Sequence, residues 1–217
     1  MAQEIEGLGE RLRLARERSG ISQRELARRL DLSPSMISQL EKDISKPSVG
    51  TLYAVVTELG VSVDSILRGS NDGFGSPPTP SEGDAHDGDG PLVHPDQRRG
   101  VDLSSGVRWE ELIPGSEPGI EFLHTIYEVG GASTPDESLM RHNGKEYGYV
   151  FSGRLGIQIG FDTHYLEPGD SIGFDSTEPH RFFNAGNETV HAIWLVLDRD
   201  DPNGQAGGWA AAHQSMG

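Results

Sequence analysis

Two short segments in the second half of the chain carry side chains suited to metal chemistry. The first runs His142-Asn-Gly-Lys-Glu146, and the second contains Pro179-His180. Two imidazoles and one carboxylate are sufficient for a facial triad around Fe(II) or another first-row divalent ion, with positions left open for water or a ligand. The alternative is that these three side chains form a hydrogen-bonded network in a metal-free pocket that binds a small molecule. Both interpretations stay open at this point.

Residues 1–68 carry the signals of several short helices. Ser22 and Glu25 can form a capping box, and Ser33-Pro34 is an N-cap followed by proline at the first helical position. Apolar residues recur at helical spacing in each segment. The pattern predicts five short helices, and the short connection between the second and third is typical of a helix-turn-helix.

The segments Ile21-Ser-Gln-Arg-Glu-Leu-Ala and Ser33-Pro-Ser-Met-Ile-Ser-Gln-Leu-Glu-Lys resemble the XRE family of helix-turn-helix regulators, related to the phage lambda repressor and Cro. The resemblance covers about residues 7–67. It implies that the third helix enters the major groove of double-stranded DNA. The residues that match typical family positions are Gln23, Ala27, Ile37, Ser38, Glu41, Pro47 and Leu52.

On this third helix, Ile37 and Leu40 face the core and leave the polar side for DNA. The Gln39 amide can pair bidentately with adenine, and Met36 can contact a thymine methyl group. Side chains at the start of the second helix are placed for phosphate contacts. For any single position, a solvated charge or a helix cap is the alternative. The DNA-binding candidates are Gln23, Arg24, Arg28, Ser33, Ser35, Met36, Ser38, Gln39, Lys42 and Lys46.

From Val107 onward, short alternating runs are separated by turn residues about every eight to twelve positions. This pattern is typical of an antiparallel sandwich or barrel, and an eight-strand jelly roll is the simplest closure. The fold class predicted for the whole chain is therefore multidomain, with an all-α bundle followed by an all-β barrel. The predicted strands are 107–112, 122–129, 146–151, 155–159, 163–166, 171–174, 180–184 and 190–197.

The segments around His142 and His180 resemble the two motifs of the cupin family, over roughly residues 120–197. The resemblance implies that His142, Glu146 and His180 converge inside a jelly-roll barrel on a divalent metal, for which Fe, Zn, Ni and Mn are the candidates. Met140 stands where the family has a further histidine, and a thioether is a poor ligand for such an ion. Asp175 and Thr177 also depart from the family pattern. The effector-binding candidates are Met140, His142, Glu146, His180, Phe182 and Trp194.

The charge of the chain is unevenly distributed. It has 18 Lys+Arg and 34 Asp+Glu, a net charge of -16, yet residues 1–68 are neutral and the excess lies in the remainder. We expect a DNA-binding domain at 1–68, a disordered acidic Gly/Pro-rich linker at 69–100, a cupin domain at 101–197 and a flexible tail at 198–217. Because the acidic remainder repels phosphate, DNA affinity should be modest and strongly salt-dependent.

The sequence also excludes several classes of site. It has no cysteine, so disulfides, cysteine-zinc sites and thiol nucleophiles are absent. It has no run of about 18 apolar residues and no secretory signal pattern at its start. We therefore expect a cytoplasmic protein with no membrane partner.

These features predict a transcriptional regulator, and not an enzyme, whose cupin domain senses a small-molecule effector. A homodimer is expected because one helix-turn-helix contacts too few base pairs for useful specificity. The alternative is a mononuclear non-haem iron enzyme similar to hydroxypropylphosphonate epoxidase, which has the same two-domain layout. That enzyme uses a lysine of its helical domain, whereas the second helix here starts with Gln23 and Arg24. A third interpretation is a cupin kept purely as a dimerisation scaffold.

Overall fold

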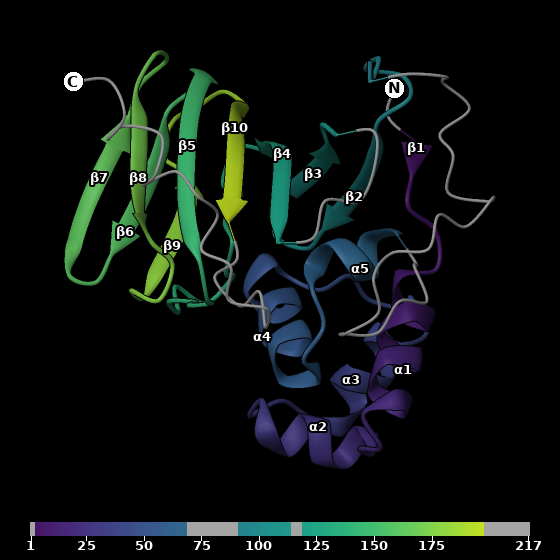
Figure 1. Cartoon of the computed structure of the whole chain (residues 1–217). Helices are drawn as coiled ribbons and strands as arrows, with labels where there is room; N and C mark the ends of the chain where they lie inside the picture. Colours follow the sequence, from purple (N-terminus) through teal and green to yellow (C-terminus); the bar gives the residue numbers. More distant parts are fainter. Residues whose placement is uncertain (1–2, 69–90, 114–118, 198–217) are drawn as a thin grey trace, which may run out of the picture.

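The computed structural model describes residues 3–68, 91–113 and 119–197, and its first part is a bundle of five helices (Figure 1). The prediction of five short helices is confirmed. Within the described residues, no helix combines the length and apolarity needed to cross a membrane. Most of the predicted linker and the whole predicted tail lie outside the described residues. The helices are α1 (Leu8–Arg18), α2 (Gln23–Arg29), α3 (Pro34–Leu40), α4 (Val49–Leu59) and α5 (Val63–Arg68).

Local sequence signals determine where these helices begin and end. Ser22, Ser33 and Ser48 each accept a hydrogen bond from the backbone amide three residues further on, at 3.1 Å. These caps satisfy amide groups that have no partner inside the helix. Gly60 ends α4 in the left-handed conformation, with φ of 65°, which glycine adopts without a steric penalty.

A buried ion pair joins α1 to the residue that follows α3. Arg16 donates from Nε and Nη2 to the two carboxylate oxygens of Glu41, at 2.5 and 3.0 Å. Gln23 Nε2, at the start of α2, donates to the same carboxylate at 2.7 Å. Arg16 is 8% exposed and Glu41 is 5% exposed. This network fixes the two helices of the DNA-binding motif relative to α1.

The second part of the chain is an antiparallel jelly roll of two sheets. The larger sheet has the order β1-β2-β3-β4-β10-β5-β8, and the smaller has the order β7-β6-β9. All eight predicted strands are present, with ends shifted by two residues or fewer. The strands are β1 (Gln3–Glu4), β2 (Arg99–Leu103), β3 (Val107–Glu111), β4 (Ile120–Tyr127), β5 (Lys145–Ser152), β6 (Leu155–Ile159), β7 (Asp162–Leu166), β8 (Ser171–Asp175), β9 (His180–Asn184) and β10 (Val190–Leu197).

The sequence did not predict β1 and β2. β2 begins at Arg99, inside the segment assigned to the linker, and pairs on one side with β3. On its other side it pairs in parallel with β1, which comes from the start of the chain. Because β1 precedes the helical bundle, this pairing ties the start of the described chain to the sheet of the cupin domain.

The helical bundle packs directly against the barrel. Gly50 N donates to Ser133 O at 3.1 Å, and Ser104 N donates to Pro47 O at 2.8 Å. In Figure 1, α4 and α5 lie against the lower edge of the sheet that contains β4 and β10. The first turn of α4 is therefore part of the contact between the two domains.

Candidate metal centre and nucleic-acid interface

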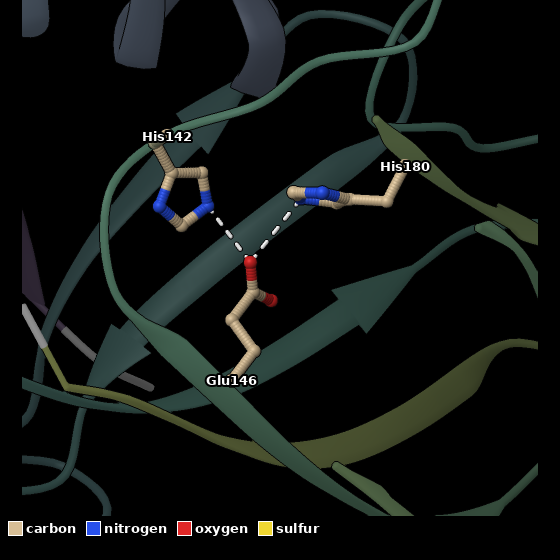
Figure 2. Close-up of side chains that lie close together, drawn as sticks. All are labelled: His142, Glu146 and His180. Atoms are coloured by element: carbon tan, nitrogen blue, oxygen red, sulfur yellow. Dashed lines mark ion pairs between the residues drawn. The ribbon is translucent and has the colours of Figure 1, made fainter. Parts of the chain in front are cut away.

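Figure 2 shows that the side chains of His142, Glu146 and His180 point toward one another. His142 precedes β5, Glu146 lies on β5, and His180 is the first residue of β9. His142 Nε2 lies 2.7 Å from Glu146 Oε1, and His180 Nε2 lies 3.2 Å from the same oxygen. The three residues are 8%, 2% and 0% exposed, respectively. The structure thus brings together the three side chains expected to form a metal site.

Neighbouring groups determine which atoms face the centre of this triad. His180 Nδ1 lies 2.8 Å from the carbonyl oxygen of Glu178, and His142 Nδ1 lies 3.1 Å from that of Asn143. A carbonyl oxygen only accepts, so each Nδ1 carries a proton and each neutral ring presents the Nε2 lone pair to Glu146. The other carboxylate oxygen of Glu146 accepts a hydrogen bond from Trp194 Nε1.

Three buried acceptor atoms therefore converge on one point. Despite their short separations, His142 Nε2, Glu146 Oε1 and His180 Nε2 make no hydrogen bond of acceptable geometry. Their ligand atoms lie within 4.8 Å of one another. Buried lone pairs that face one another require a positive charge between them, supplied by a proton or by a metal ion. The donor set and the carbonyl partners of both rings fit a first-row divalent ion.

The ionisation of the triad follows from burial and mutual contact. Burial by itself raises the pKa of the Glu146 carboxyl, but the two imidazoles outweigh this effect and lower its pKa to about 2. For His142, burial lowers the pKa, while the Glu146 carboxylate 2.7 Å away more than compensates and leaves the pKa raised. Without a metal ion, the site thus favours a carboxylate and a protonated His142.

A cavity of about 20 Å³ lies beside the triad. Met140, Phe182 and Trp194, three of the residues expected to contact an effector, line it together with Glu146. Met140 also pairs through its backbone with His180, at 2.9 and 2.8 Å, which positions that histidine. The remaining lining residues are Val49, Tyr53, Trp109, Leu123, Thr125, Tyr127 and Val196.

Tyr53 is one of the lining residues that sequence reasoning missed. It lies on α4, in the helical domain, yet its ring stacks on the His142 ring with centroids 3.9 Å apart and an interplanar angle of 2°. Its hydroxyl donates to Glu121 Oε2, on β4, at 2.8 Å. Burial, reinforced by the Glu121 charge, raises the pKa of the Tyr53 phenol well above its ordinary value, so the phenol stays a donor. The α4 sequence offers no signal for this role, since Tyr53 is placed like an ordinary core residue.

The second candidate site is the outer side of α3. Ser35, Met36 and Gln39 are exposed there, Ser38 is half-buried, and Ile37 and Leu40 are buried, as the helical spacing predicts. Ser33 is exposed, but its hydroxyl accepts from the Met36 amide as the N-cap.

The basic and amide candidates around α3 differ in their availability. Arg24, Arg28 and Lys42 are exposed. Gln23 is held by Glu41. Lys46 is exposed, and its ammonium lies 3.2 Å from Asp102 on β2, in the cupin domain.

Both parts of the chain match known families. Residues 12–66 match the helix-turn-helix family model, and residues 123–196 match the cupin domain model. The HTH-type transcriptional regulator PuuR of Escherichia coli K12 is 28% identical over 181 residues, 82% of this chain and 89% of that protein. The regulator SutR of the same organism is 24% identical over 185 residues, 85% of this chain and 91% of that protein. A helix-turn-helix transcriptional regulator from Vibrio cholerae has a similar structure, with a TM-score of 0.59, 20% identity and coverage of 88% of this chain and 94% of that chain.

The fold, the site and these matches define a two-domain protein in which a helix-turn-helix precedes a cupin barrel. The chain has an XRE-type helix-turn-helix domain followed by a cupin domain, the architecture shared with the regulators PuuR and SutR, and is a DNA-binding transcriptional regulator. Hydroxypropylphosphonic acid epoxidase from S. wedmorenis is a more distant structural neighbour, with a TM-score of 0.44 and 20% identity, which is too low to support the enzyme alternative.

Proposed function

We propose that this regulator binds its operator as a homodimer through α3, and that it senses a small-molecule effector at a divalent ion held by His142, Glu146 and His180. The observation that supports the sensing role is the convergence of three buried acceptor atoms without hydrogen-bond partners. These atoms lie beside a cavity whose wall includes Tyr53 of the DNA-binding domain. The pocket is therefore placed to influence that domain.

The triad has a simple role in this proposal. Two imidazoles and a carboxylate on one side of an ion leave its other coordination positions open to an oxygen or nitrogen donor of the effector. Trp194 orients the Glu146 carboxylate through its indole N–H, and the carbonyl oxygens of Asn143 and Glu178 orient the two rings. Phe182 and Trp194 supply apolar contact area.

The test combines metal analysis with DNA binding by the full-length chain. Purified protein should contain about one divalent ion per chain, and it should shift a fragment of its own upstream region at low salt. Protein without bound metal after incubation with Fe, Zn, Ni or Mn salts would overturn the metal part of the proposal. Failure to shift any such DNA would overturn the operator part. Turnover of an oxidant by the iron-loaded chain would favour the enzyme alternative.

Gln39→Ala should weaken operator binding by about 5- to 150-fold, because a bidentate amide–adenine pair contributes about 1–3 kcal/mol of discrimination. Binding to unrelated DNA should change little, since the Gln39 amide would contact bases rather than phosphates. The measurement is a fluorescence anisotropy titration of both DNAs at one salt concentration.

Lys42→Ala is the contrasting variant for this experiment. Lys42 is exposed just after α3 and would act through its charge. The substitution should weaken binding to both DNAs alike and reduce the slope of log affinity against log salt by about 1. If Gln39→Ala also weakened both DNAs equally, Gln39 would have no role in sequence recognition.

The affinity of the triad for a divalent ion should fall as the pH falls. The pKa of His142 is raised in the metal-free site, so a proton competes with the ion for Nε2 below that pKa. We expect a loss of about tenfold in affinity for each pH unit below it, since one proton must be released for each ion bound. Competition titrations with Zn²⁺ between about pH 5.5 and 8 would measure this. An affinity independent of pH in that range would show that His142 is not a ligand.

A further inference from the structure

The DNA-binding domain fills part of the effector site with its own side chain. Tyr53 is 6% exposed and covers one face of the His142 ring. Its ring also meets Trp109 edge to face, with centroids 5.8 Å apart. Its hydroxyl reaches across to Glu121 on the barrel. Every one of these partners belongs to the cupin domain, although Tyr53 belongs to the helical domain.

The space that remains is too small for an effector. The cavity of about 20 Å³ has room for one or two water molecules. Pockets that bind small molecules are typically about 300–1,000 Å³. An effector that reaches the triad must therefore displace side chains. Val49 and Tyr53 are the lining residues that come from the helical domain, and the Tyr53 side chain contacts His142 and Glu121 across the domain boundary.

Tyr53 lies on the same helix that makes backbone contacts with the barrel, so its movement would disturb the contact between the domains. Three residues before Tyr53, Gly50 donates its amide to Ser133 O at 3.1 Å. Pro47, just before α4, accepts from Ser104 N at 2.8 Å. The first turn of α4 thus lies on the barrel backbone, and the Tyr53 ring one turn further on lines the pocket.

We propose that Tyr53 is a ligand-displaced latch: it occupies the effector's place in the cupin pocket, and effector entry releases α4 and the DNA-binding domain from the barrel. The inference rests on the proposed function, because it assigns the regulation of the same site. Since docking and ligand binding exclude each other, ligand lowers the equilibrium constant for docking by the same factor by which docking lowers the affinity for ligand.

The latch also indicates what the ligand must provide. Displacement of Tyr53 uncovers the flat face of His142 and removes the phenol donor from the Glu121 carboxylate. A ligand with a planar group and a hydroxyl or amine donor would replace both contacts. Aromatic residues on the barrel side, Trp109 and Phe182, would surround the planar group.

Gly50, at the contact between the domains, allows docking to be blocked without a substitution of a residue that lines the pocket. A Cβ atom on Gly50 would lie 2.7 Å from Cγ2 of Thr134, a buried β-branched side chain. Gly50→Ala should therefore block docking, while it favours α4 itself because alanine is the better helix former. Thr134→Ser removes the clashing methyl group and keeps the hydroxyl that donates to Ser138 O. The double variant Gly50→Ala/Thr134→Ser should dock again.

Domain placement is measured in the full-length, metal-free chain. Because the protein has no cysteine, Thr57→Cys on α4 and Phe161→Cys on the β6–β7 turn give one pair of spin labels at two exposed positions. We expect one narrow distance in the parent chain and in Tyr149→Ala, the same truncation at an exposed tyrosine of the barrel. Gly50→Ala and Tyr53→Ala should give broad distributions, and the double variant should regain the narrow one.

Access to the pocket is measured on the same chains by diethyl pyrocarbonate modification and peptide mapping. His142 should react at least tenfold faster in Gly50→Ala and Tyr53→Ala than in the parent, and at the parental rate in the double variant. Exposed His94 is the internal control. The latch is overturned if both variants keep the narrow distance, or if the domains separate while the His142 rate stays within twofold of the parent. Neither readout needs metal or DNA, so a failure of the proposed function would be seen separately.

Discussion

Glu146→Gln should lower the affinity of the chain for Zn²⁺ or Fe(II) by about 100-fold or more. Loss of an outer-shell partner alone costs a metal site about 10- to 100-fold, and Glu146 supplies the charged ligand. The glutamine oxygen can still accept from the Trp194 indole, so the substitution removes the negative charge while keeping the shape of the side chain. Competition titration against a chelator of known affinity would measure the change.

The matched control is Glu178→Gln. Glu178 is exposed and contributes to the site through its backbone carbonyl, which accepts from His180 Nδ1 at 2.8 Å and survives the substitution. The metal affinity of the Glu178→Gln chain should stay within about twofold of the parent, because an exposed charge outside the coordination sphere is screened by solvent. If Glu146→Gln bound metal as tightly as this control, Glu146 would not be a ligand, and the ion would be bound by other groups of the chain.

The parts of the fold that sequence predicted correctly are those with local signals. Serine caps at Ser22, Ser33 and Ser48 mark helix starts through hydrogen bonds that span only three residues. β3, β5, β9 and β10 alternate between more and less buried positions with a period of two. β2 was missed because its identity as a strand depends on distant partners, β1 at the start of the chain and β3 on its other side.

The residues of the candidate site likewise fall into those with a local sequence signal, which were predicted, and those without one, which were missed. His142, Glu146 and His180 were predicted because two motifs carry them at a recognisable spacing. Tyr53 was not, since its role depends on how two domains dock, which no pattern within α4 encodes. Lys46 shows the same limit, because its contact with Asp102 exists only when the domains are in contact. Residues between domains are thus the ones for which the sequence alone was least informative.

Arg16→Ala should destabilise the helical domain by about 3–5 kcal/mol. The substitution leaves the Glu41 carboxylate, 5% exposed, without its main partner, and an uncompensated buried charge is costly. The free energy of unfolding can be measured by urea denaturation followed by circular dichroism at the helical signal. Arg13→Ala is the control: Arg13 also lies on α1 and pairs with Glu10, but that pair is exposed and screened by solvent, so its loss should change the free energy of unfolding far less. If the two variants lost the same free energy of unfolding, burial of the Arg16–Glu41 pair would not explain its contribution to stability.

The double variant Arg16→Met/Glu41→Leu separates stability from positioning. Replacing both partners of a buried ion pair with apolar residues of similar volume is often neutral or stabilising by about 1–4 kcal/mol, so this chain should recover or exceed the parental stability. Its operator affinity should nevertheless fall, because Gln23 loses the carboxylate that ties the start of α2 to the end of α3. We expect at least a tenfold loss for the operator and little change for unrelated DNA, measured by anisotropy. A double variant that is stable and binds the operator normally would show that packing alone positions α3. A stable variant that no longer distinguishes the operator from unrelated DNA would show that the ion pair positions α3 for sequence recognition.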